Sequence, residues 1–197
     1  MNKIWSTLLL LLIFFYGFPQ EKKNSIPVRE DKFFIKEWNS VSFSLDKLSD
    51  LHDETDNLQL VDSYDDIYKK ERQWCSSSEY YYYAIIDTTN YYSYVYFYFK
   101  DYVKSFVLVN YDKKGKYIDD VVISSISGDW GYSVSVDGIF SNDSTIIQTE
   151  MEEELIEGTP EAAIFEYTIT SLIRHKIILK KDGHIQKDTL RQYIPCK

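Results

Sequence analysis

The residues of this sequence with the clearest chemical potential are three glutamates that alternate along one short segment. Glu150, Glu152 and Glu154 recur at every second position, with Glu153 among them. Alternate side chains of a β-strand point to the same face, so the three carboxylates would share a face and Glu153 would lie opposite. Such a row could bind a basic partner, coordinate Ca²⁺ or, with two carboxyl groups at a suitable separation, hydrolyse a glycoside. The alternative is a solvated acidic surface that protects a strand from edge-to-edge pairing.

The sequence lacks the common catalytic and metal-binding motifs. Its three histidines do not recur at metal-ligand spacing, and it contains no G-x-S-x-G, P-loop or G-x-G-x-x-G segment. Cys75 and Cys196 cannot form a zinc site alone, because no cluster of histidines or cysteines accompanies them. In an oxidising compartment they could form a disulfide, and otherwise they stay reduced; the sequence leaves both states open. We therefore expect no cofactor and no metal, and we assign no catalytic residue.

The most distinctive segment is the aromatic stretch at residues 80–99. Four tyrosines recur at every second position of this stretch: Tyr92, Tyr94, Tyr96 and Tyr98. Val95, Phe97 and Phe99 fill positions between and after them, so a strand here would be central in a sheet that is covered at least partly on both sides. If the tyrosines are exposed, they form with Trp130 an aromatic platform for sugar rings or another apolar ligand. In the alternative, they pack beneath a second layer.

The positions of all these residues depend on a β-sheet, which the pattern from residue 80 onward predicts. Strands are expected at residues 80–86, 91–100, 106–111, 117–125, 128–138, 145–156, 163–179 and 184–194, the seventh being one long strand or two that break near Ser171. Turn sequences such as Lys181-Asp182-Gly183 separate them. We predict a mainly β (α+β) fold with a single antiparallel meander sheet of roughly eight to ten strands. The sheet could be curved, barrel-like or two-layered, and a short helical segment precedes it.

The residues ahead of the sheet predict one strand and two short helical segments. The strand is expected within residues 33–45, whose second half alternates apolar residues with serines. Ser44 or Asp46 could cap the helical turn that follows. Residues 63–72 carry acids near their start and bases near their end, which suits the dipole of a short surface helix.

The first 20 residues have the layout of a secretory signal peptide. Lys3 precedes an apolar run from Ile4 to Phe18, and Pro19 with the polar residues after it ends the run. The run is short for a membrane span, which needs about 20 residues. No typical cleavage site follows, so an uncleaved anchor is the alternative. We expect a leader at residues 1–20, a flexible lead-in at 21–32 and a single β-rich domain at 33–197.

The composition limits the classes of partner. The chain has 197 residues, 44% of them hydrophobic and 17% aromatic, and its net charge is −9. That charge opposes binding to nucleic acid or to an anionic membrane surface, and it permits binding to a basic protein. We therefore expect no nucleic-acid partner, and membrane contact only through an uncleaved N-terminal segment.

Parts of the sequence resemble many small exported proteins of Bacteroidota bacteria. The similarity lies in the leader end FFYGFPQEKKN, the tyrosine-rich strands, and the turns YDKKGKYIDD and KKDGHIQKD. This resemblance implies an exported setting, which is periplasmic, at the cell surface or secreted. It points to no functional family and carries over no catalytic residue.

Three hypotheses for the function follow. The first is a non-enzymatic exported binding module of the cell envelope, whose ligand is a glycan, a lipid or another envelope protein. The second is an inhibitor or immunity-like protein whose acidic surface, with Glu150, Glu152 and Glu154, binds a basic partner. The third is a carboxylate-dependent hydrolase of an envelope polysaccharide, which no motif supports.

Overall fold

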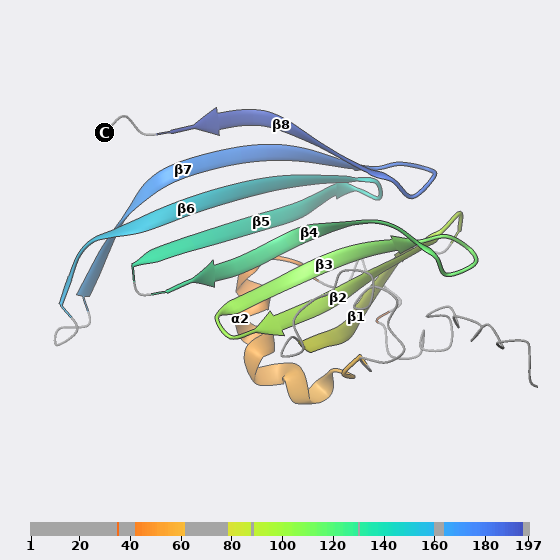
Figure 1. Cartoon of the computed structure of the whole chain (residues 1–197), viewed down its shortest axis with the longest axis horizontal. Helices are drawn as coiled ribbons and strands as arrows, with labels where there is room; N and C mark the ends of the chain where they lie inside the picture. The colour runs from red at the N-terminus through yellow and green to blue at the C-terminus, as the bar shows by residue number, and fades with distance from the viewer. Residues whose placement is uncertain are drawn as a thin grey trace, which may run out of the picture.

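The computed structural model describes residues 35, 42–61, 79–87, 89–129, 131–159 and 164–194. Within these ranges the chain forms one antiparallel sheet of eight strands, with one short α-helix ahead of the first strand (Figure 1). The strands lie across the sheet in sequence order, from β1 at one edge to β8 at the other, and the sheet is curved and not closed. The predicted mainly β meander is therefore confirmed.

The strand bounds agree with most of the predicted ones. The strands are β1 (Glu79–Asp87), β2 (Tyr92–Lys100), β3 (Val103–Tyr111), β4 (Tyr117–Gly128), β5 (Tyr132–Asn142), β6 (Thr145–Thr159), β7 (Ile164–Leu179) and β8 (Ile185–Tyr193). β5 begins later than expected, because the Asp129 carboxylate accepts hydrogen bonds from the backbone N–H groups of Gly131 and Tyr132 and holds a turn there. It also ends later, at Asn142, whose side chain accepts a hydrogen bond from the backbone N–H of Ser144 in the next turn. β7 is a single strand, and Thr170 is an extra residue in its pairing with β6 close to the expected break at Ser171.

Several predictions concern residues outside the described ranges. They are the leader at 1–20, the lead-in at 21–32, the helix at 63–72, Trp130, and the state of Cys75 and Cys196. These stay predictions. Among the described residues, no helix has the length and apolar character that crossing a membrane requires.

The helix ahead of the sheet, α2 (Leu45–Glu54), begins where the sequence predicts a cap. Ser44 is its N-cap, and the Ser44 hydroxyl accepts a hydrogen bond from the backbone N–H of Lys47. The predicted strand at 33–45 is wrong at its end, because residues 42–43 are not in a strand, Ser44 caps the helix and Leu45 is its first residue. Phe43 is instead a core residue, whose ring packs edge-on against Phe106 at 5.6 Å between centroids.

The first four strands form the buried half of the sheet. On one face, α2 covers an apolar cluster that includes Leu48, Val95 and Phe97, which we call the helix-side core. On the other face, tyrosines and valines of β1–β3 form a second cluster with Val61, which we call the tyrosine core. In β2, six consecutive residues of the nine are buried. The prediction that this strand is covered on both sides is therefore confirmed.

The turn between β7 and β8 packs against the buried half of the sheet. The Asn110 side chain is buried in β3 and donates a hydrogen bond of 2.7 Å to the carbonyl of Gly183 in that turn. The backbone N–H of Ile185 donates to the carboxylate of Asp119 in β4. Gly183 has a φ of +88°, which favours glycine, and it lies against the side chain of Ile118.

A second glycine allows β5 to approach β4 closely. A Cβ atom at Gly138 would lie 2.3 Å from the backbone oxygen of Ile123. The Gly138 N–H donates a hydrogen bond to the hydroxyl of Ser124, and the Gln148 side chain donates to the carbonyls of Val122 and Ile123. Side chains thus replace part of the backbone pairing where the buried and the open halves of the sheet meet.

The last four strands are far more exposed than the first four. Most of the exposed large apolar side chains of the described chain lie here: Tyr132, Ile139, Ile156, Tyr167, Ile169, Leu190, Tyr193 and Ile194. Every residue of β8 is exposed or half-buried. The sheet therefore has a buried half at β1–β4 and an open half at β5–β8.

Candidate functional site

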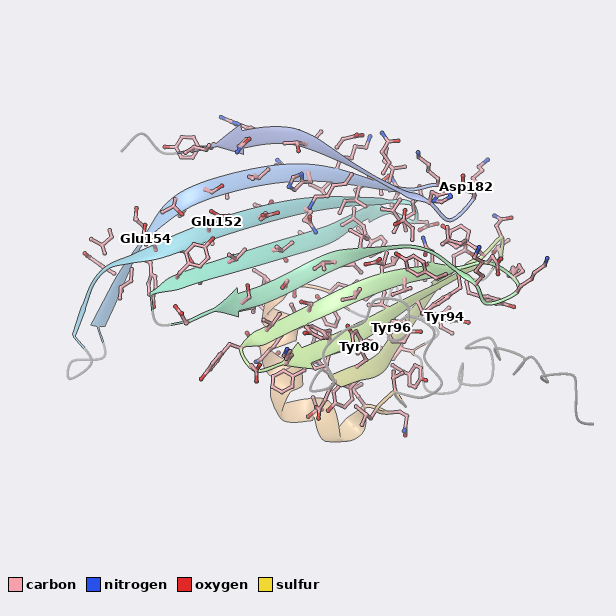
Figure 2. The ribbon with its side chains drawn as sticks, in the orientation of Figure 1. Tyr80, Tyr94, Tyr96, Glu152, Glu154 and Asp182 are labelled. Carbon is pink, nitrogen blue, oxygen red and sulfur yellow. The ribbon has the colours of Figure 1, made fainter. Side chains whose placement is uncertain are left out.

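The predicted tyrosine platform lies in the tyrosine core. Tyr94 and Tyr96 are 0% and 1% exposed, and Tyr98 is also buried. Figure 2 labels Tyr94 and Tyr96 together with Tyr80 of the same core. Tyr92 is half-buried; its ring stacks against Tyr94, and the ammonium of Lys113 lies 4.3 Å from its centroid. The alternation of these tyrosines on one face is confirmed, and their burial matches the alternative in which the rings pack within the fold. A ligand-binding role for them stays a prediction without support from exposure.

The predicted acidic row is present on β6. Glu150, Glu152 and Glu154 pair with Val136, Val134 and Tyr132 of β5 in an unbroken register, so the three carboxylates share one face, seen in part in Figure 2. Glu153 points to the other face, where its carboxylate accepts a hydrogen bond from the hydroxyl of Ser133. Loss of hydration and the charges of Glu152 and Glu150 raise the pKa of the Tyr132 phenol. Binding of a basic partner and hydrolysis stay predictions.

One member of this row belongs to a polar cluster with basic side chains. Glu150 lies 3.6 Å from Nε2 of His175 and 3.9 Å from Nζ of Lys187. His175 is buried, and its Nδ1 is 3.2 Å from the hydroxyl of Thr189. Burial and the charge of Lys187 lower the pKa of His175, while Glu150 acts in the opposite direction. Glu150 is therefore partly neutralised and less available to a partner than Glu152 or Glu154.

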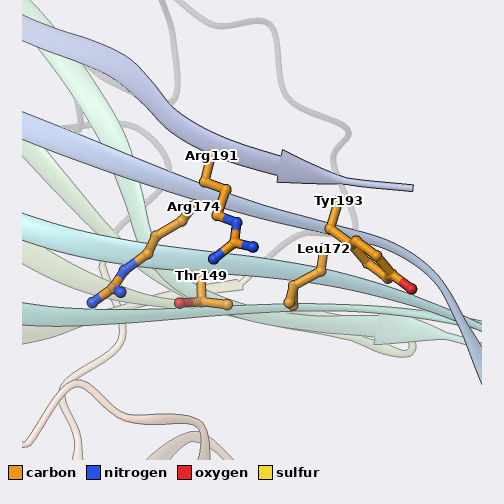
Figure 3. A pocket seen from close by; sticks show the side chains of 5 residues that line it. All are labelled: Thr149, Leu172, Arg174, Arg191 and Tyr193. Atoms are coloured by element: carbon orange, nitrogen blue, oxygen red, sulfur yellow. The ribbon is translucent and has the colours of Figure 1, made fainter. Parts of the chain in front are cut away.

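The opposite face of β6–β8 carries a hollow that the sequence analysis did not anticipate. Its volume is about 350 Å³ and it is lined by Thr149, Leu172, Arg174, Arg191 and Tyr193 (Figure 3). These residues alternate with the buried Gln148 and His175, so they point away from the core. Figure 3 shows both guanidinium groups toward the Thr149 side of the hollow and the Tyr193 ring toward the Leu172 side. The hollow thus has a basic end and an apolar end.

The basic end consists of two arginines at directly opposite positions. Arg174 of β7 and Arg191 of β8 are cross-strand partners, and both are exposed. In the described part of the chain, neither forms an ion pair with a carboxylate. Like charges at directly opposite positions destabilise a sheet, so this pair is unfavourable unless an anion lies between the guanidinium groups.

A bulge in β8 is the reason why the two arginines meet. The cross-strand pairs from Leu179 with Ile185 to His175 with Thr189 follow one register. The next pair, Arg174 with Arg191, is shifted by one residue. Leu190 is the extra residue, and in an unshifted register it would lie opposite Arg174. Arg191 would then point to the other face of the sheet, because neighbouring residues of a strand alternate.

The apolar end of the hollow continues along β6 and β7. Leu172 pairs with both Tyr193 and Met151, Ile169 pairs with Glu153, and Tyr167 pairs with Leu155. These residues lie on the same face as the arginines, and we call this surface the open face: Thr149, Met151, Glu153, Leu155, Tyr167, Ile169, Leu172, Arg174, Arg191 and Tyr193. Tyr167, Ile169 and Tyr193 are 42%, 40% and 54% exposed. The open face is therefore a strip of accessible apolar side chains that ends at a pair of arginines.

Sequence reasoning missed this surface, although one signal pointed toward it. Residues 164–194 contain six lysines and arginines against three acids, whereas the whole chain has a net charge of −9. That local excess of basic residues marks the last two strands as unusual. It does not identify Arg174 and Arg191, because their juxtaposition depends on the bulge.

No cluster of histidine, cysteine and acidic side chains suited to a metal ion occurs among the residues that the structure describes. No protein-family model matches this chain, and no curated protein or solved structure is detectably similar to it.

Proposed function

We propose that this chain is a non-enzymatic binding module that contacts its ligand through the open face of β6–β8. The observation that carries the proposal is the unequal burial of the two halves of the sheet. β1–β3 are packed on both faces, whereas the open face presents half-exposed Tyr167, Ile169 and Tyr193, of which Tyr193 also lines the hollow. Apolar side chains gathered on one surface, next to polar groups that can orient a ligand, are typical of binding sites.

The proposed setting is the cell envelope or the exterior of the cell. It is supported by the leader-like layout of residues 1–20, which lie outside the described ranges. A glycan, a lipid or an envelope protein is the proposed class of ligand. The open face favours a ligand with apolar character, because a polar ligand would leave Ile169 and Leu172 without a matching contact.

Site-specific photo-crosslinking in cells that produce the protein naturally tests this function. A photoreactive amino acid replaces Tyr167 or Tyr193 in separate variants, and Tyr102, which is 77% exposed in the turn between β2 and β3, is the control position. We expect one adduct of defined mass at both test positions and none at the control. The adduct is then identified by mass spectrometry, and the compound or protein must bind the purified chain. Equal labelling at all three positions, or no adduct at positions 167 and 193, would contradict the proposal.

A further inference from the structure

The charge arrangement on the open face identifies the chemistry of a ligand. Arg174 and Arg191 face each other across β7 and β8, and no described carboxylate forms an ion pair with either of them. Glu150 pairs with His175 and Lys187 on the opposite face. Asp188 lies on the arginine side of β8, and its carboxylate accepts hydrogen bonds from the Gln186 side chain. Charge complementarity therefore favours an anion between the two arginines.

The guanidinium group sets the shape of that anion. It presents several N–H donors in a planar fork that matches the oxygens of a carboxylate or phosphate, and two adjacent forks can hold one oxyanion from two sides. The hydroxyl of Thr149 lies at the same end of the hollow and can donate a further hydrogen bond (Figure 3). This end therefore suits a head group with two or three oxygen atoms.

The rest of the open face suits an apolar tail. From Arg174 the strip continues past Leu172 and Ile169 to Tyr167, over a length of roughly 20 Å at the usual rise of a strand. Tyr193 lies directly opposite Leu172 and widens the strip. Glu153 lies beside Ile169 on this face, and its negative charge repels an anion there. The head group is thus restricted to the arginine end, and the tail to the Leu172–Tyr167 end.

We propose that the open face binds single molecules of an anionic amphiphile, with a carboxylate or phosphate between Arg174 and Arg191 and an apolar tail along Leu172, Ile169 and Tyr167. The inference rests on the proposed binding function and specifies its ligand class. A single molecule is favoured over a membrane surface because the net charge of −9 and the charge of Glu153 repel an anionic bilayer.

Binding measurements on the full chain with four probes test this assignment. Dodecyl phosphate and laurate carry both head and tail, dodecyl maltoside carries the tail with a neutral head, and inorganic phosphate carries the head alone. Below their critical micelle concentrations, we expect both anionic amphiphiles to bind at least about tenfold more tightly than either single-feature probe. Equal binding of dodecyl phosphate and dodecyl maltoside would overturn the anion site and would leave an apolar binding function in place.

Variants of the basic end separate the geometry from the net charge. Arg174→Gln and Arg191→Gln should each weaken binding of dodecyl phosphate by about tenfold. Lys181→Gln is the matched control, because it removes the same charge from the exposed turn between β7 and β8 and should change binding less than about twofold. Equal weakening in all three variants would mean that only net charge matters, and it would overturn the proposal.

Exchange of residues 191 and 192 is a test in which the net charge does not change. The double variant Arg191→Gln with Gln192→Arg keeps both arginines in the chain but moves one of them to the position opposite Ile173, on the other face of the sheet. We expect dodecyl phosphate to bind this variant no more tightly than dodecyl maltoside does, while circular dichroism reports an intact fold. If the exchange prevents folding, the two glutamine variants decide the question. Retained anion preference in the folded exchange variant would overturn the assignment, as would binding to phosphatidylglycerol vesicles without binding of monomeric amphiphiles.

Discussion

At the scale of single residues, His175 shows how the core side of β6–β8 differs from the open face. It is 8% exposed and packs between Glu150, Lys187 and Thr189. Burial is the main cause of its lowered pKa, and the nearby ammonium of Lys187 is the second. Both causes favour the neutral imidazole in the folded chain. The imidazole lies beside the carboxylate of Glu150 and the ammonium of Lys187, whose opposite charges compensate each other.

We predict that this histidine makes the folded state less stable as the pH falls. A histidine in an unfolded chain has a pKa of about 6.5. Because the folded pKa is lower, the unfolded state binds more protons as the pH falls through that value, and the free energy of unfolding decreases until the folded pKa is passed. Urea unfolding of the wild type between pH 7.5 and pH 5 should show this loss, and the loss should be smaller in His175→Gln.

The matched control is His184→Gln. The His184 side chain is 61% exposed and lies 3.8 Å from the carboxylate of Asp119. This variant keeps His175 and should therefore still lose stability as the pH falls. If His175→Gln and the wild type lose stability in parallel, the assignment of the effect to His175 is wrong.

At the scale of elements, the strands were predictable and their exact pairing was not. The alternation of Tyr92 to Tyr98 with Val95 and Phe97 predicts a strand that is covered at least partly on both sides, and β2 is such a strand. Ser44 predicted the start of α2, because its hydroxyl can cap a helix in its own sequence neighbourhood. The juxtaposition of Arg174 and Arg191 depends instead on a one-residue bulge between two strands, which no local pattern encodes. The basic end of the candidate site therefore required the structure.

Gly138 offers a test of the junction where β5 leaves β4. In Gly138→Ala, the new Cβ would lie 2.3 Å from the Ile123 backbone oxygen, which cannot move aside by changing a rotamer. We expect a loss of about 1–3 kcal/mol in the free energy of unfolding, measured by urea denaturation. Gly131→Ala is the control, because its nearest neighbour is a side-chain oxygen of Asp129 at 3.8 Å. Equal stability of the two variants would show that β5 does not approach β4 as closely as described.

At the scale of the whole molecule, the two halves of the sheet should differ in local stability. β2 and β3 lie between the two cores, whereas β8 is an edge strand with little burial. Amides of β2 and β3 should exchange with deuterium only on global unfolding, and those of β8 should exchange through local opening. Hydrogen–deuterium exchange followed by mass spectrometry of peptides measures both rates. Protection of β8 equal to that of β2 would mean that something else covers the open half.

The facing arginines also have a consequence for the history of the sequence. Replacement of either Arg174 or Arg191 by a neutral or acidic residue would remove a repulsion between cross-strand partners and should stabilise the folded chain. Random substitution under selection for folding alone would therefore tend to eliminate the pair. Proteins that descend from this sequence and retain both arginines would do so although the pair lowers the stability of the fold. Such retention would indicate selection for binding of the ligand between the two arginines.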